Sequence, residues 1–448
     1  MRHNRAYLAT VTFLTAMPLL AGCIGQGGTV SSEQTQVHGQ GTVIKIASAE
    51  TAAPAMDALK KAGLEYEKET GVKVIFEPIP LADVYTKVNS TWGTSAEYSA
   101  FLTGFLGHVT LFESEDRLVP VDDIIDTLGG KSDFYDGQEI YPIKGKAYWV
   151  PYDFNLAFGL IRTDWLKEKG LSVPKTWDDL VNVAKAFTDK SKKQYGFIMP
   201  FKADSSTDWV TSQLLWANKA RILDDNFKVA LDSPETLPKT VESMKLLREL
   251  HQYMPTRADN ATYADLTEAY LSGQVGMTFY TGRVIDMALK QDPSLVDRTQ
   301  IFGFPMKDGS GVTAGLGGDG LAIFKTKQSD ETKKFVTWFY KNKLMDLLAT
   351  APFHFFPAQK SIYNSKEWRA IPNVEKYFTK GMEPQLKLIE SPNLASIDSQ
   401  GGSPDFRAGA IFTSELLPEM YQRVAIAGED PTTVAKDVSN KIRKLIKE

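Results

Sequence analysis

The segment Gly145–Thr188, GKAYWVPYDFNLAFGLIRTDWLKEKGLSVPKTWDDLVNVAKAFT, joins an extended stretch to an amphipathic helix. Its first part, Tyr148–Ile161, is rich in aromatic and β-branched residues, which predicts extended chain. Thr176 can cap a helix, with Asp179 three residues further on. One buried face of that helix is predicted from apolar residues at helical spacing, namely Trp177, Leu180, Ala184 and Phe187. The segment therefore predicts a fold that mixes strands with helices.

The start of the folded region has the order strand, helix, strand. Val43–Ala47 predicts a short strand, and the residues from about Ala53 to Glu69 predict a helix that ends at Thr70-Gly71. Val72–Pro78 predicts the second strand. Such a unit forms a parallel sheet with a right-handed crossover, so the fold class is α/β. Ligands of these sheets bind beyond the carboxyl ends of the strands, which draws attention to the loop at 48–51.

Residues 150–180, VPYDFNLAFGLIRTDWLKEKGLSVPKTWDDL, are similar to a run found in the family 1 extracellular solute-binding proteins, the group that includes the maltodextrin binders. One departure is Arg162-Thr163-Asp164, where the family usually has Asn-Lys-Asp. Further matches follow in family order over 270–283, 302–323, 330–348 and 428–446. The resemblance covers roughly residues 43–448.

This resemblance implies a two-lobe, type II periplasmic-binding-protein-like fold, in which discontinuous lobes are joined by a hinge that the chain crosses three times. The expected first lobe is 43–153 plus about 312–350, and the expected second lobe is about 154–303 plus 358–448. The crossings are expected near 152–154, 304–311 and 351–358. The ligand would lie between the lobes, and the closed form would dock on the transmembrane subunits of an ABC permease driven by a separate ATPase.

Candidate ligand contacts in the first lobe and its crossing are polar. Glu50 follows the first predicted strand, and Asp153 and Asn155 lie in the first crossing, where relatives commonly hold a hydroxyl with a carboxylate or amide. Sugar hydroxyls favour such groups, and sugar faces favour aromatic rings. Each of these three residues could instead be a solvated loop residue.

In the second lobe the candidates are aromatic or cationic. Trp209 matches a position that stacks on ligand in relatives, whereas Trp216 on the same helix is better explained as core. Tyr280 and Arg283 follow the strand of the 270–278 match, and Arg283 stands where a tryptophan is common. Arg283 could face an acidic group or a densely hydroxylated sugar, or it could pair with a neighbouring carboxylate.

Later segments add further candidates. Gly317, Gly318 and Asp319 would bring backbone close to the ligand. An apolar wall and a buried core are equally good interpretations of Phe355 and Phe356. Weaker candidates are Phe406 and the pair Gly401-Gly402.

The N-terminus is typical of a lipoprotein precursor. Arg2 and Arg5 precede an uncharged stretch, 7–20, that fits a secretory h-region and is shorter than the ~20 apolar residues of a membrane span. The following Leu20-Ala21-Gly22-Cys23 resembles a lipobox, and Cys23 is the only cysteine. We therefore expect a signal peptide at 1–22, lipidation of Cys23 with a flexible tether to 42, and anchoring at the outer face of the cytoplasmic membrane. An ordinary signal peptide with an incidental cysteine is the alternative.

Other classes of site have little support. The net charge of −4 argues against a nucleic-acid partner. The GxGxxG match at 315–320 is followed by a strand instead of a helix, and Gly130-Lys131-Ser132 lacks the glycine that a P-loop needs at position 125. The five histidines are far apart in sequence, so we predict no metal and no cofactor.

Two functions of different class therefore remain. The first is capture of a mono- or oligosaccharide or polyol, or of another polar or anionic solute, by a monomeric binding protein without chemistry. The second is an anchored glycosidase, for which Glu50 and Asp153 are the only evident carboxylate pair. A chemoreceptor or scaffold role of the same cleft is a weaker third possibility.

Overall fold

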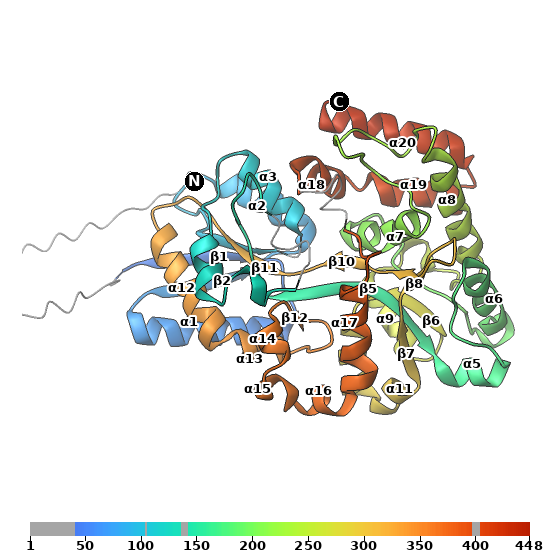
Figure 1. The fold of residues 1–448 in the computed structure, drawn as a ribbon, viewed down its shortest axis with the longest axis horizontal. Coiled ribbons are helices and arrows are strands. Elements are labelled where there is room, and N and C mark those ends of the chain that lie inside the picture. The colour runs from blue at the N-terminus through green and yellow to red at the C-terminus, as the bar shows by residue number, and fades with distance from the viewer. Residues whose placement is uncertain (1–40, 104, 136–141, 397–403) are drawn as a thin grey trace, which may run out of the picture. The chain divides into compact units, whose positions relative to one another are not determined.

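A computed structural model describes residues 41–103, 105–135, 142–396 and 404–448. Its strands form two five-stranded sheets and one two-stranded sheet, with helices packed around them (Figure 1). Each larger sheet has its own set of helices, which we call the first and the second lobe. The predicted α/β, two-lobe fold is thereby confirmed.

The sheet of the first lobe has the order β2-β1-β3-β11-β4. These strands are β2 (Lys73–Pro78), β1 (Val43–Ser48), β3 (Ala100–Thr103), β11 (Gly320–Ile323) and β4 (Val150–Pro151). β1 pairs in parallel with both β2 and β3, whereas β11 is antiparallel to β3 and β4. Helix α1 (Ala53–Thr70) connects β1 to β2 and ends at Gly71, whose φ of 77° lies in the left-handed region that glycine favours. The strand–helix–strand prediction is confirmed.

The sheet of the second lobe is built on one long strand, β5 (Asp153–Arg162). Four short strands pair with it in antiparallel fashion: β10 (Gly315–Gly317), β12 (Phe356–Pro357), β6 (Met277–Tyr280) and β7 (Thr299–Phe302). The helix predicted after it is α6 (Trp177–Phe187), and Thr176 and Asp179 form the expected reciprocal capping box.

Three passages connect the two sheets. The chain passes from β4 to β5 at 151–153, from β10 to β11 at 318–319, and from the first lobe to β12 before Phe356. The second passage comes later than the crossing expected near 304–311. In that region β8 (Phe304–Pro305) and β9 (Val312–Thr313) pair as a hairpin that a turn through Gly309 closes.

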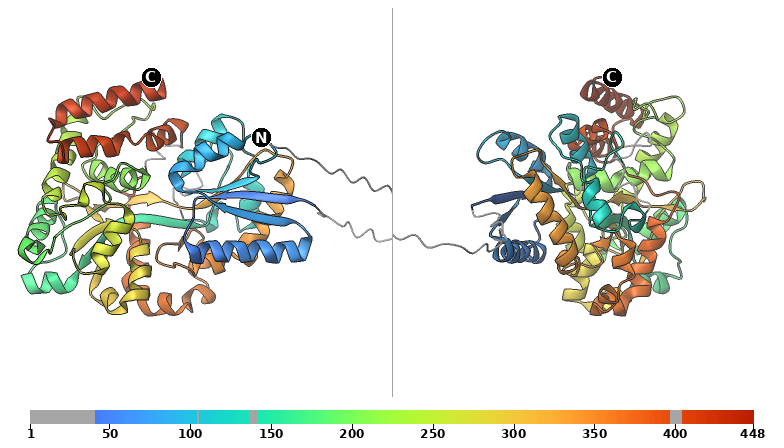
Figure 2. Two further views of the ribbon diagram at one scale, coloured as in Figure 1. Left: turned by 180° about the vertical axis from the view of Figure 1, so that it is seen from behind. Right: turned by 60° about the vertical axis from the view of Figure 1, so that its left-hand side comes forward.

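The helices divide between the lobes in the same way (Figures 1 and 2). With the first sheet lie α1, α2 (Leu81–Thr91), α3 (Leu106–Ser114), α4 (Asp122–Thr127), α12 (Ser329–Asn342) and α13 (Leu344–Leu348). Around β5 and the β8–β9 hairpin lie α5 (Thr163–Lys169), α6, α7 (Ser205–Ala217), α8 (Leu237–His251), α9 (Tyr263–Leu271), α10 (Arg283–Gln291), α11 (Pro293–Asp297) and α17 (Glu383–Ile389). A chain of short helices leads to α17: α14 (Lys360–Tyr363), α15 (Lys366–Arg369), α16 (Pro372–Tyr377) and a π-helix (Phe378–Met382).

The last three helices belong to the second lobe, and one of them also contacts the first lobe. Two of them, α19 (Leu416–Ala425) and α20 (Pro431–Ile446), pack with α8 in the second lobe. α18 (Phe406–Thr413) touches α7, α19 and α20, and its other side packs on α3 of the first lobe (Figure 1). Among the described residues no helix has the length and apolar character that crossing a membrane requires.

Candidate functional site

A cavity of about 540 Å³ lies between the lobes, at the carboxyl end of β1. We call it the inner cavity. The first lobe contributes the loop 49–52 with Pro80, Phe105 and Asp319, and residues of the second lobe and its crossings complete the wall. Seven of the predicted residues line it: Glu50, Asn155, Trp209, Tyr280, Arg283, Gly317 and Asp319. The loop chosen from the strand order of the first lobe thus faces the cavity.

An ion pair joins the two lobes in the wall of this cavity. The Arg283 guanidinium donates from Nη2 to Oε2 of Glu50 at 2.8 Å, and the backbone N–H of Ala52 donates to Oε1 at 2.6 Å. Both partners are largely buried, with side-chain exposures of 7% for Glu50 and 19% for Arg283. Burial lowers the pKa of Arg283, but the facing carboxylate outweighs it and the pKa stays above its usual range. Of the roles considered for Arg283, pairing with a neighbouring carboxylate is the one observed.

Four aromatic rings form a continuous surface along the cavity. Phe105 lies edge-to-face with Trp209 at a centroid distance of 6.5 Å, and Trp209 lies edge-to-face with Tyr280, also at 6.5 Å. Tyr263 then stacks on Tyr280 at 5.9 Å with an interplanar angle of 10°. Three of these rings come from the second lobe, whereas Phe105 comes from the first.

Trp209 is held more tightly than a free stacking platform would be. It is only 5% exposed, and its Nε1 donates to the carbonyl of Leu316 at 3.1 Å. Its ring covers β10, where a Cβ on Gly317 would lie 3.2 Å from the indole and 3.1 Å from the Asn155 carbonyl oxygen. Glycine at position 317 therefore allows the Trp209 ring to pack closely on β10 at the wall of the cavity.

The passages between the sheets carry carboxylates with different environments. Asp153 is fully buried, and its Oδ1 accepts from the backbone N–H of Asp319 at 2.6 Å, so it ties two passages together and does not line the cavity. Burial raises the pKa of Asp319 to about 7, and the nearby Glu50 adds to that rise. The buried Oδ1 of Asn155 has no hydrogen-bond partner within the described part of the chain, although its residue lines the cavity.

Three further predicted residues are absent from the wall. Gly318 lies in the passage to β11, and Phe355 and Phe356 are fully buried. Phe355 packs edge-to-face on Tyr152 and lies 5.5 Å below the Arg283 guanidinium, so the core interpretation describes both phenylalanines. These phenylalanines are buried because β12, which begins at Phe356, pairs with the buried start of β5.

The weaker candidates lie elsewhere. Trp216 is part of the hydrophobic core, as its helical position suggested. Phe406 begins α18 with 42% of its surface exposed and does not line the cavity. Gly401-Gly402, like Cys23 and the tether as far as residue 40, lies outside the described residues.

Sequence reasoning missed several wall residues. Asp204 caps α7 by accepting from the N–H of Thr207 at 3.1 Å, and this places Ser205 and Ser206 at the cavity. The cap signature was visible in the sequence, but not the direction in which the helix end points. His354 also lines the wall; burial, together with the charge of Arg283, holds its pKa well below the usual range.

A metal site in a protein requires several His, Cys, Asp or Glu side chains that lie close together. Within the ranges that the structure describes, no three His, Cys, Asp or Glu side chains lie together in a way that could hold a metal ion. The wall of the inner cavity presents hydrogen-bonding groups, an ion pair and aromatic rings.

Comparison with known proteins agrees with this architecture. The chain is 25% identical to the putative ABC transporter periplasmic-binding protein YcjN of Escherichia coli over 328 residues, which cover 71% of this chain and 73% of that protein. A solute-binding protein of Agrobacterium radiobacter solved with ribitol superposes with a TM-score of 0.73 at 21% identity, over 91% of this chain and 99% of the other. A sugar transporter protein of Arthrobacter chlorophenolicus solved with laminaribiose gives 0.75 at 17% identity, over 90% and 99%. At these identities the two structures support the fold.

The family model of the bacterial extracellular solute-binding proteins matches residues 48–346. This range covers four strands of the first sheet, β2, β3, β4 and β11, the passages at 151–153 and 318–319, and the wall residues from Glu50 to Asp319. The match also decides between the two classes of function, because members of this family bind solutes and are not enzymes. The chain therefore belongs to the bacterial extracellular solute-binding protein family.

Proposed function

We propose that this protein captures a neutral, hydroxyl-rich solute, a sugar or a polyol, in the inner cavity and delivers it to the transmembrane subunits of an ABC importer. The observation that carries the proposal is the inner cavity, whose wall comes from both lobes and sets aromatic rings beside carboxylate, amide and hydroxyl groups. Sugars and polyols present hydroxyl groups, and sugar rings also present weakly apolar faces. The ligands named for the two solved relatives, ribitol and laminaribiose, share this chemistry.

The charges of the wall favour a neutral ligand over an anionic solute. Its two cationic side chains, Arg283 and Lys202, face three acidic residues, Glu50, Asp204 and Asp319, and burial raises the pKa of Asp319 to about 7. Arg283 already has its carboxylate partner at 2.8 Å. An anionic ligand would have to compete with Glu50 for this guanidinium, whereas a hydroxyl can bond to the pair without separating it.

Binding is proposed to work by closure of the lobes. The lobes turn about the passages near 152–154, 318–319 and 351–358, and the ligand contacts both. Only a ligand that binds the closed form more tightly than the open form shifts the population toward closure. A shift from mostly open to mostly closed requires a preference of about 5.5 kcal/mol. The closed, loaded monomer then docks on the permease.

Anchoring at the membrane completes the proposal. The Leu20–Cys23 sequence resembles a lipobox, and a diacylglyceryl group on Cys23 would hold the protein at the outer face of the cytoplasmic membrane. Two or more acyl chains anchor a protein stably, whereas a single chain does not. The extracellular character of the family supports this location.

The proposal is tested with the lipidated protein purified in a detergent without a sugar headgroup. Thermal unfolding is followed with ribitol, mannitol, laminaribiose and maltose, and in parallel with sugar acids such as glucuronate. A ligand at about 100 times its Kd stabilises by roughly 2.7 kcal/mol. We expect a neutral sugar or polyol to raise the melting temperature, with isothermal titration confirming one site. Stabilisation by the acids alone, or by none of an extended panel of neutral sugars and polyols, contradicts the proposal.

A further inference from the structure

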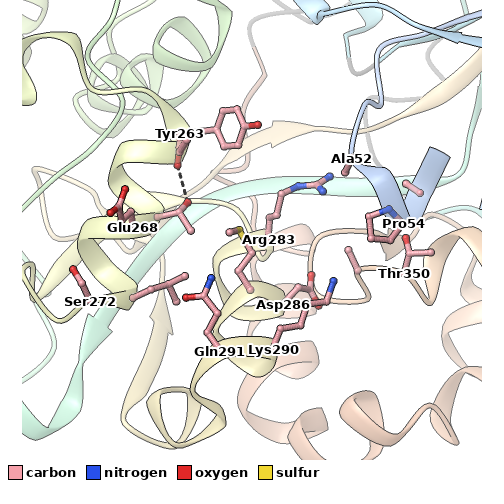
Figure 3. Close-up of a pocket in the computed structure, with 16 residues that line it drawn as sticks. Ala52, Pro54, Tyr263, Glu268, Ser272, Arg283, Asp286, Lys290, Gln291 and Thr350 are labelled. Atoms are coloured by element: carbon pink, nitrogen blue, oxygen red, sulfur yellow. Dashed lines mark hydrogen bonds between the residues drawn. The ribbon is translucent and has the colours of Figure 1, made fainter. Parts of the chain in front are cut away.

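A second interlobe cavity, of about 730 Å³, lies next to the first. We call it the outer cavity. Figure 3 shows its lining, which includes Pro54 at the start of α1, Glu268 on α9, and Lys290 and Gln291 at the end of α10. Its walls therefore come from both lobes, as those of the inner cavity do. A void of this size is within the range of small-molecule sites.

The two cavities adjoin. Ala52, Tyr263 and Arg283 line both of them. In Figure 3 the Arg283 side chain extends toward Ala52, and the aromatic ring of Tyr263 lies across from it. The ion pair between Arg283 and Glu50 therefore lies at the boundary between the two spaces.

The other end of the aromatic surface, at Phe105, is packed against α18. There Phe105 packs on Phe412 of α18 at a centroid distance of 3.9 Å. The two helices that bear this contact, α3 and α18, touch backbone to backbone, because a Cβ on Gly409 would lie 2.3 Å from the Gly107 carbonyl oxygen. A ligand longer than the inner cavity therefore has space past Tyr263, whereas the described rings of Phe105 and Phe412 pack together at the other end of the aromatic surface.

The aromatic surface follows the same direction. It begins at Phe105, continues through Trp209 and Tyr280, and ends at Tyr263, which belongs to both cavities. Tyr263 is 47% exposed, so its ring still has a free face after stacking on Tyr280. Beyond it, the exposed polar side chains Glu268 and Lys290 stand within reach of hydroxyl groups in the outer cavity.

One carboxyl group of the outer cavity is already engaged. The two oxygens of Asp286 accept from the backbone N–H groups of Phe353 and His354 at 3.3 and 3.0 Å. Its function is to hold α10 against the third passage, so a ligand would depend on the exposed groups at the ends of α9 and α10. These groups are polar and carry charges of both signs, as expected for a site that binds a neutral chain of sugar units.

We propose that the outer cavity is a further sugar subsite, so that the ligand is an oligosaccharide of at least two units bound end-on. One terminal unit lies in the inner cavity against Phe105 and Trp209, and the next unit lies over Tyr263 in the outer cavity. This inference rests on the proposed function and narrows its substrate class from sugars and polyols to short sugar chains.

The test compares chain lengths. Mono-, di- and trisaccharides of glucose, mannose, galactose and xylose, in several linkages, are titrated into the lipidated protein by calorimetry. In any series that binds, we expect the disaccharide to bind at least about 10-fold more tightly than the monosaccharide. If the monosaccharide or a polyol binds as tightly as the longer chains, the subsite is overturned while the proposed function stands. If no sugar or polyol binds at all, both fail together.

Variants locate the subsite. Ala264 on α9 is exposed and lines the outer cavity alone, so Ala264→Trp fills this space with little disturbance of the core. We expect the ratio of disaccharide to monosaccharide affinity to fall to near one. Gln291→Trp fills the same cavity from α10 and replaces Ala264→Trp if that variant melts abnormally. Ala370→Trp, at an exposed position that lines neither cavity, is the matched control. An unchanged ratio in both cavity variants overturns the subsite.

Discussion

Arg283 and Glu50 are 233 residues apart in the sequence, yet their side chains meet across the cleft at 2.8 Å. Glu50 follows β1 in the first lobe, and Arg283 begins α10 in the second. The pair is therefore a direct electrostatic link between the lobes. In the proposed mechanism, the ligand and the ion pair act on the same equilibrium, because both favour the arrangement in which the lobes are close.

Removing one partner of this pair should lower the free energy of unfolding by more than removing both partners. Truncating one side of a buried ion pair typically costs about 3–5 kcal/mol, because the other charge stays buried without a partner. We expect Arg283→Met or Glu50→Gln to lower the free energy of unfolding and to increase the radius of gyration without ligand. The double variant should recover part of the stability. Denaturant unfolding in a double-mutant cycle, with small-angle X-ray scattering, measures both effects. Additive losses would show that the pair does not couple the lobes.

Trp209 should contribute to both stability and binding, and one substitution cannot separate the two. Trp209→Ala is expected to lower the free energy of unfolding by about 3–5 kcal/mol, since the ring is buried against β10. Trp209→Phe keeps a ring and removes the donor to Leu316, which should cost about 1–3 kcal/mol. We expect the Phe variant to remain folded with weakened sugar affinity, as measured by calorimetry. Trp216→Phe, which alters a tryptophan of the same helix outside the inner cavity, is the control. Equal affinity in the two variants would remove Trp209 from the site.

Asp319 should make stability depend on pH in a defined direction. Burial raises its pKa in the folded protein to about 7, from 3.8 in the unfolded chain. Between these values the native state keeps a proton that the unfolded state has lost, so this contribution is complete below pH 3.8 and disappears as pH rises to 7. Burial lowers the pKa values of His108 and His354, which act in the opposite direction, so the useful quantity is the difference in unfolding free energy between the variant and the native protein. We expect Asp319→Asn to gain stability relative to the native protein as pH rises from 4 to 7. Denaturant unfolding at several pH values measures this difference, and a constant difference would contradict it.

Local patterns in the sequence predicted the local structure well. The capping box at Thr176 and Asp179 and the strand–helix–strand order after Val43 depend on neighbours in the chain, and both were found where expected. The carboxyl end of β1 then located Glu50, because strand direction in a parallel sheet fixes which loops face the ligand side.

Features that depend on distant segments were harder to predict. The second passage lies at 318–319 because β10 pairs with β5, and no short-range signal in the GLGGD sequence shows which strand will accept it. Phe355 and Phe356 could equally be wall or core by composition, and only the pairing of β12 with β5 decides for the core. Tyr263 and Phe105 join the site from segments whose own sequences carry no mark of a ligand. Their contribution arises from the packing of the two lobes.

Cys23 should determine whether the protein stays with the membrane. Cys23→Ser removes the thiol to which a diacylglyceryl group would be attached, and the sequence contains no other cysteine. We expect the native protein to remain with the membrane fraction at high salt and to incorporate a labelled fatty acid. The serine variant should lose the label, and its mature domain should be released or remain as an unprocessed precursor. Labelling that persists in the variant would contradict lipidation at this residue.

Gly409 offers a test of closure that does not alter the cavity wall. In an ordinary helix, alanine is more stable than glycine by roughly 0.5–1 kcal/mol. Here a Cβ on Gly409 would lie 2.3 Å from the carbonyl oxygen of Gly107 in the other lobe, so the two helices must separate to admit it. We expect Gly409→Ala to open the unliganded protein and to weaken sugar binding, despite the better helix former. Ala410→Ser, at the next position of α18, is the control. X-ray scattering and calorimetry measure the two effects. Scattering and affinity equal to those of the native protein would mean that α3 and α18 do not need this contact to close the cleft.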